Sequence, residues 1–249
     1  MDQNNQQPFS NYTVLESKQH TGAVAKTFFA RVFLWMFAAL AISTFSAFLF
    51  ASTPSLMAYL INETGRGLSG LGYITMFAPI GFVLAMSAGF SRFSSSVLIL
   101  LFMLYAAVTG ISLSFILLAY TSGSVMGCFA SAAGMFGIMA IMGYTTTQDL
   151  TSFGRIMMMG VIGIIISGII NMFLHSSGLE YIISIVGVLA FTGLTAYDVQ
   201  VLKRIGAGME YEGTSAEDTQ KTAIMGALRL YLDFINLFLM LLRLFGRRK

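Results

Sequence analysis

Seven apolar segments follow one another along the chain, separated by polar connections. Each segment has close to the about 20 residues that cross about 30 Å of hydrocarbon. Backbone exposed to lipid has to satisfy its own hydrogen bonds, so each segment is expected to be a helix. The pattern predicts an all-α membrane protein with seven transmembrane helices, near residues 28–51, 71–91, 97–119, 125–144, 156–175, 181–203 and 223–246.

The polar positions define the rest of the organisation. Residues 1–27 open with "DQNNQQ" and are predicted to form a flexible tail, followed by one transmembrane domain over residues 28–249. No cleavage site follows a short apolar core, so the first segment is expected to be an uncleaved anchor. The connection "RIGAGMEYEGTSAEDTQK" is acidic. It is read as a solvated loop, with a mouth that attracts cations as the alternative.

Composition supports the membrane assignment. Among 249 residues, 56% are hydrophobic and only 10% are charged, whereas soluble domains carry about 25% charged residues. The net charge of +3 comes mostly from segment ends, which does not indicate nucleic-acid binding. No phosphate-binding glycine loop or zinc spacing is present, so no cofactor is expected. The single cysteine, Cys128, lies in an apolar run and is expected to pack in the core.

Basic residues predict the orientation, because short cytoplasmic loops are enriched in Lys and Arg. An N-terminus in the cytoplasm places eight basic residues on that side and leaves only Arg66 in the outer loops between spans. The C-terminal Arg247, Arg248 and Lys249 then lie outside, against the rule. The seventh segment is expected to cross the membrane nevertheless, with a segment that dips in and returns as the alternative. The eight are Lys18, Lys26, Arg31, Arg92, Arg155, Lys203, Arg204 and Lys221.

Two aspartates interrupt the last two spans, and ionisable residues within a membrane are functional candidates. Asp198 lies near the cytoplasmic end of the sixth span, and Asp233 lies about 15 Å into the seventh. The connecting loop puts the facing ends on one side, so the two carboxyl groups can approach each other. Such a pair would share a proton and titrate as a unit. Protonated, it would hold the two helices together; deprotonated, it would offer oxygen ligands to Ca²⁺.

The seventh span carries further polar residues on one face. Arg229, Asp233 and Asn236 are spaced four and three apart, and Arg243 follows two heptads after Arg229. The stripe is interpreted as lining a closed pore, with Arg229 competing with Asp198 for Asp233. An Arg229–Asp233 ion pair within the helix is the structural alternative.

The segments "LTAYDVQVLK" and "LYLDFINLFLMLLRLFG" resemble the Bax inhibitor-1 family, also called the transmembrane BAX inhibitor motif proteins, and bacterial members in particular. The resemblance covers essentially the whole chain. It implies six helices wrapped around a central seventh and a pH-sensitive leak of Ca²⁺. It also implies a sensor formed by Asp198 and Asp233, with Arg92 as a partner from the second span. Arg229 departs from the small polar residue expected before "LYLD".

Three functions compete at this stage. The preferred one is a pH-gated calcium-leak channel without enzymatic activity. An accessory protein that binds a membrane protease or translocase through the polar tail is the alternative. An intramembrane aspartyl protease would also use two aspartates on adjacent spans. Such enzymes carry Gly-x-Gly-Asp at the second aspartate, where this chain has "LYLD". A bacterial inner membrane is the expected location, with the endoplasmic reticulum membrane as the alternative.

Overall fold

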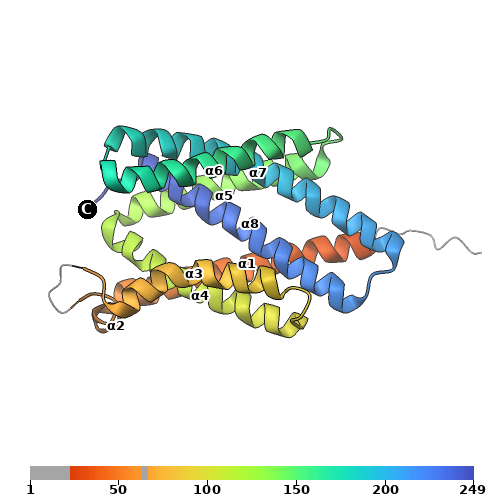
Figure 1. Ribbon diagram of the computed structural model, residues 1–249, viewed down its shortest axis with the longest axis horizontal. Coiled ribbons are helices and arrows are strands. Elements are labelled where there is room, and N and C mark those ends of the chain that lie inside the picture. Colours follow the sequence, from red (N-terminus) through yellow and green to blue (C-terminus); the bar gives the residue numbers. More distant parts are fainter. Residues whose placement is uncertain (1–22, 63–66) are drawn as a thin grey trace, which may run out of the picture.

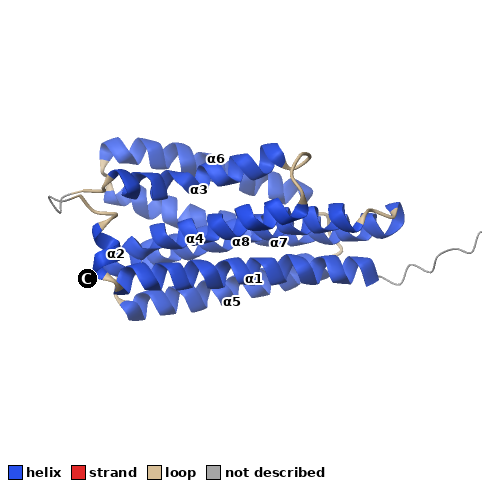
Figure 2. Ribbon diagram, turned by 90° about the horizontal axis from the view of Figure 1, so that it is seen from below, coloured by secondary structure: helices blue, strands red, loops and turns tan. Residues whose placement is uncertain are grey.

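The computed structural model describes residues 23–62 and 67–249, with the side chains of residues 210–212 excepted. The described residues form one short and seven long helices and no strand (Figures 1 and 2). All seven long helices are apolar enough to cross a membrane, which confirms the predicted fold class. The helices are α1 (Ala23–Ser52), α2 (Pro54–Ala58), α3 (Gly70–Gly89), α4 (Ser95–Ala119), α5 (Ser122–Thr145), α6 (Thr151–Leu174), α7 (Ser177–Glu212) and α8 (Ala216–Phe245).

Helix α8 is buried over most of its length and packs against α1, α4, α5 and α7. Helices α3 and α6 are the least buried of the long helices, and pack chiefly against α4 and α7. That six helices encircle a central seventh therefore stays a prediction. Cys128 is buried against α8, with its Sγ 3.7 Å from the carbonyl oxygen of Leu241, as expected of a packing residue.

Small residues let the helices approach closely, as expected for packing in lipid. A side chain at Gly110 of α4 would collide with the backbone of Ser43 on α1. One at Gly143 of α5 would collide with the backbone of Ala196 on α7. These two contacts fix α1 and α7 against their neighbours.

The connection between α7 and α8 is much shorter than the sequence predicted. Both helices extend into the acidic segment, and only Gly213, Thr214 and Ser215 separate them. Gly213 ends α7 in the left-handed conformation (φ 63°), which favours glycine. Ser215 caps α8, with its Oγ accepting a hydrogen bond from the backbone N–H of Asp218 at 3.0 Å. The prediction of a long loop was wrong, because charged residues can form helix where the chain lies outside the hydrocarbon.

The first helix also starts earlier than expected. Helix α1 begins at Ala23, so residues 23–27 are helical rather than part of a tail, and residues 1–22 lie outside the described range. Helix α8 runs without interruption, and its C-terminal end lies at the opposite end of the molecule from the start of α1 (Figure 1). The seventh segment is therefore one continuous helix long enough to cross a membrane, and it does not turn back on itself.

Candidate functional site

The short turn between α7 and α8 determines where the two aspartates lie. Asp198 is 14 residues before the end of α7, and Asp233 is 17 residues after the start of α8. At 1.5 Å per residue both lie about 21–26 Å from the turn. Antiparallel neighbours joined by so short a turn bring these levels together. The sequence-based expectation that the two residues face each other thus has a structural cause.

Asp198 forms an ion pair with Arg229 of the neighbouring helix. The Arg229 Nε lies 2.7 Å from Oδ2 of Asp198. Asp198 is only 2% exposed, whereas the Arg229 side chain keeps 42% of its surface exposed. The guanidinium carbon lies 6.0 Å from the centre of the Tyr197 ring. The alternative of an Arg229–Asp233 ion pair within α8 is not what the structure shows, because Arg229 turns across to α7.

Asp233 completes the cluster. It is 5% exposed, and its carboxyl group lies within electrostatic reach of that of Asp198. Oδ1 of Asp198 and Oδ2 of Asp233 are buried without a hydrogen-bond partner among the described residues. Two carboxyl groups thus lie near each other, and the arginine contacts only one of them. With both ionised, the cluster would carry one uncompensated negative charge, which a proton or a cation could balance.

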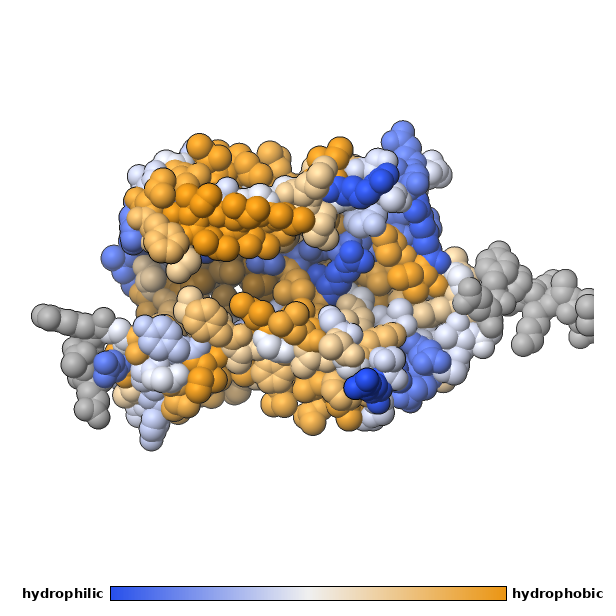
Figure 3. Space-filling view, in the orientation of Figure 1, coloured by the Kyte–Doolittle hydropathy of each residue, from blue (hydrophilic) through white to orange (hydrophobic). Residues whose placement is uncertain are grey.

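The molecular surface is hollowed on one face. Figure 3 shows this hollow between α6 on one side and α3 and α4 on the other, with hydrophilic and hydrophobic residues inside. A resident metal site is not evident there, since no group of three or more metal-binding His, Cys, Asp or Glu side chains occurs among the described residues. Two carboxylates alone suit transient binding better than a permanent ion.

Arg92 does not belong to this cluster in the structure. It lies in the exposed turn between α3 and α4, where its backbone N–H donates to the carbonyl oxygen of Gly89 at 2.9 Å. Its side chain forms no ion pair with any described residue. Arg229 is the arginine paired with Asp198 in the structure. The role of Arg92 stays a prediction.

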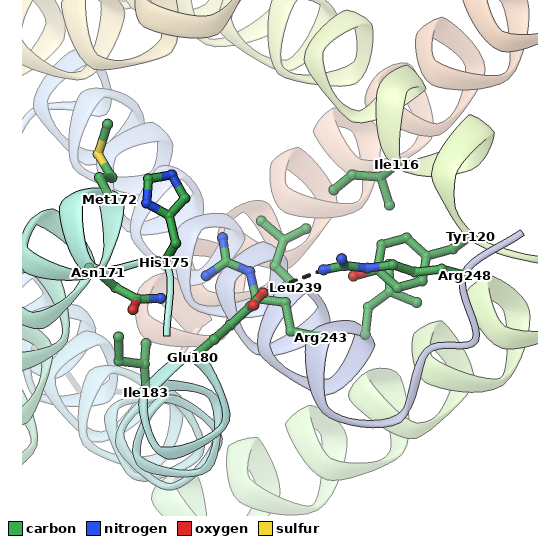
Figure 4. A pocket seen from close by; sticks show the side chains of 12 residues that line it. Ile116, Tyr120, Asn171, Met172, His175, Glu180, Ile183, Leu239, Arg243 and Arg248 are labelled. Carbon is green, nitrogen blue, oxygen red and sulfur yellow. Dashed lines mark ion pairs between the residues drawn. The ribbon is translucent and has the colours of Figure 1, made fainter. Parts of the chain in front are cut away.

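The other two predicted residues of α8 lie farther along the helix. Asn236 is half-buried one turn beyond Asp233. Arg243 is exposed and lines a cavity of about 700 Å³ at the end of the molecule where the chain terminates (Figure 4). His175, Glu180 and Arg248 line the same cavity. The polar stripe of α8 therefore leads from the aspartate cluster to this cavity.

The last residues of the chain border this cavity. The Thr121 N–H donates to the carbonyl oxygen of Arg247 at 3.0 Å, and the Lys249 N–H donates to that of Ala119 at 2.9 Å. Arg248 forms a loose ion pair with Glu180, at 3.5 Å. No sequence pattern predicts these contacts of the C-terminal residues, because they depend on which loops meet at one end of the bundle.

A second feature that the sequence did not reveal lies two residues from Asp198. The Gln200 side chain accepts from the Leu150 N–H at 2.9 Å and donates to the carbonyl oxygen of Gln148 at 2.7 Å. It thereby ties the α5–α6 connection to α7. Arg204, one turn on, forms an exposed ion pair with Asp149 at 2.7 Å. The polar residues after Asp198 in "YDVQVLKR" were the available signal.

Sequence comparisons agree with this architecture. Residues 25–249 match the family described as "Inhibitor of apoptosis-promoting Bax1". The chain is 43% identical to the inner membrane protein YbhL of Escherichia coli K12, covering 90% of this chain and 93% of the relative. It is 41% identical to an uncharacterized protein of Borreliella burgdorferi, covering 91% and 94%. An uncharacterized membrane protein of Streptococcus pyogenes is 34% identical, covering 88% and 92%.

Proposed function

From the premise that the chain belongs to the Bax inhibitor-1 family, we propose that it is a pH-sensitive calcium-leak channel of a bacterial inner membrane. The location follows the relative YbhL, whose name places it in the inner membrane. The N-terminus is proposed to be cytoplasmic, on the distribution of basic residues. The proposed activity is not enzymatic, and Ca²⁺ is its cargo rather than a cofactor.

One observation carries the proposal: Asp198 and Asp233 are both buried, each with an oxygen that has no partner among the described residues, and only Asp198 is paired with an arginine. An unbalanced negative charge in a low-dielectric surrounding is costly, so the site favours a proton or a cation. At low pH a proton would satisfy the carboxylate oxygens and leave the site neutral. At higher pH the same oxygens would be free to bind a hard cation. Competition between the two is a physical basis for pH-dependent passage of Ca²⁺.

Passage also needs a second conformation, because pH can only bias states that already exist. Helices α7 and α8 are held at this level by the Asp198–Arg229 ion pair. A cation that binds the carboxylates would compete with Arg229 and loosen this contact. The partly exposed Arg229 side chain lets its guanidinium move toward water without burying a new charge.

The test is Ca²⁺ flux into proteoliposomes between about pH 5 and pH 8. Wild type should show pH-dependent flux, and Asp198→Asn and Asp233→Asn should each lose the dependence. Asp149→Asn is the matched control, since it removes an exposed aspartate that is also paired with an arginine. It should behave as wild type. Flux no greater than in empty liposomes at every pH would overturn the channel and favour the accessory function.

A further inference from the structure

A lateral groove separates α1 from α5. Both helices pack against α8, but they scarcely pack against each other. Three cavities of about 420, 610 and 440 Å³ lie one after another in this groove and share lining residues. Phe234 of α8 lines the first two, and Phe238 lines the third. The groove is therefore continuous, and its floor is the buried helix α8.

The groove has the dimensions and chemistry of an acyl-chain site. From Phe29 to Phe48 its lining spans 19 residues of α1, or about 28 Å, close to the hydrocarbon thickness of about 30 Å. Its lining side chains are almost all apolar, and Phe37, Phe48 and Ile141 at its rim are exposed. A lipid chain can therefore enter from the bilayer. A lipid of one leaflet can therefore occupy about half of the length of the groove.

One end of the groove is positively charged. The rings of Phe29 and Tyr144 approach to 4.9 Å and close the groove there, so a bound chain must leave it at this level. The Lys203 Nζ donates to the carbonyl oxygen of Tyr144 at 2.6 Å and lies 5.1 Å from the ring centre. Gly206 of α7, one turn from Lys203, packs against Ala25, the neighbour of Lys26 on α1. Lys203 thus lies at this end of the groove, and Lys26 lies three residues before the groove residue Phe29 on α1; both lysines are exposed.

We propose that this half of the groove binds one acyl chain of an anionic phospholipid, whose phosphate lies between Lys26 and Lys203. Apolar lining alone would accept any lipid. The two lysines at the closed end make the site selective for a negative headgroup. An ammonium group has three N–H donors, so Lys203 can donate to a phosphate while it donates to the carbonyl oxygen of Tyr144. The occupant is placed against Phe234, the residue that follows Asp233 on α8.

Native mass spectrometry of the purified full chain tests the proposal, with phosphatidylglycerol and phosphatidylcholine of equal chain length as probes. Gly137 lines the groove, and a side chain added there meets nothing within 4 Å. Gly137→Leu should therefore fill the groove and remove the retained phosphatidylglycerol. Gly134 is equally open but does not line the groove, so Gly134→Leu should leave binding unchanged. Equal loss in both variants, or in neither, would overturn the site.

The lysines are tested separately. Near a membrane surface each lysine contributes about 1 kcal/mol, so Lys26→Gln and Lys203→Gln should each weaken phosphatidylglycerol binding about fivefold. Both should weaken phosphatidylcholine binding less, because its choline offsets the charge of its phosphate. Lys203→Arg keeps the positive charge and should therefore keep the affinity for phosphatidylglycerol. Equal affinity of wild type for the two lipids would overturn the headgroup assignment.

Discussion

Two polar clusters contact α8 within one turn of each other, and they differ in whether their buried polar groups have hydrogen-bond partners. Tyr231 and Asp233 are two residues apart, so they point to nearly opposite sides of the helix. On one side the Tyr231 hydroxyl lies 2.6 Å from the Ser43 hydroxyl, which also donates to the carbonyl oxygen of Ala106 at 2.7 Å. On the other side Asp198 and Asp233 each keep a buried oxygen without a partner among the described residues.

The difference separates stability from function. The Tyr231 cluster is uncharged, and edge-to-face contacts with Phe102 and Tyr105 surround it. It joins α1, α4 and α8 into one rigid unit. The aspartate cluster holds three ionisable groups and two buried oxygens without partners among the described residues, so it costs stability that the rest of the fold has to offset. Buried groups that break local rules in this way are where function is expected.

The largest expected effect comes from deleting the Tyr231 side chain. Tyr231→Ala should lower the free energy of unfolding by about 3–5 kcal/mol, because the side chain is fully buried and leaves a cavity. Tyr231→Phe removes only the hydroxyl, and an interhelical hydrogen bond in lipid contributes about 0.6–1.7 kcal/mol. Thermal unfolding in detergent measures both. If the two variants are equally unstable, hydrogen bonding rather than packing anchors α8.

The sequence predicted the helices far better than the contacts between them. Lipid imposes a length of about 20 apolar residues on every span, so all seven were predicted within a few residues over their apolar portions. Lipid does not restrict the length of a helix outside the hydrocarbon, so the sequence did not predict how far α7 and α8 extend toward their connection. The Tyr231–Ser43 contact joins residues 188 apart in sequence, and no local pattern predicts it.

The candidate site was predicted in its residues but not in its pairing. Asp198 and Asp233 stand out because carboxylates are rare in spans. Arg229 lies four residues before Asp233 and opposite Asp198, so spacing permits either partner. The rotation of α8 about its axis selects Asp198, and that rotation depends on the whole bundle. Arg92 was assigned from its place at the end of the second span and from resemblance, and its turn follows α3, which packs chiefly against α4.

A double-mutant cycle sharpens the comparison at the charged cluster. Arg229→Gln should cost about 2 kcal/mol, less than the 3–5 kcal/mol for a fully buried pair because Arg229 is 42% exposed. Asp198→Asn combined with it should cost less than the sum of the single changes, because the Asp198 carboxylate is then no longer left without its partner. Arg243→Gln in the exposed cavity is the control and should change stability by at most about 0.5 kcal/mol. Additive single effects would contradict the ion pair.

The smallest expected effect separates charge from burial. Asp149 and Arg204 form an ion pair like that of Asp198 and Arg229, but both side chains are largely exposed. The Thr151 hydroxyl and the Arg204 guanidinium hold the pKa of Asp149 well below its usual range. Because the pKa of Asp149 is lower in the folded state than in the unfolded state, the carboxylate stabilises the fold at pH values above 3.8, its unfolded pKa. This stabilisation is lost as the pH falls toward the folded-state pKa.

Asp149→Asn should therefore lower the melting temperature slightly at neutral pH, and the difference from wild type should shrink only below pH 3.8. In an Arg204→Gln background the same substitution should have a smaller effect, since its partner is already absent. Exposed pairs are weakened by salt, so the difference should also shrink at about 1 M salt, whereas that of Arg229→Gln should persist. If Asp149→Asn lowered stability as much as Arg229→Gln does, burial would not be what makes the ion pair of the aspartate cluster important.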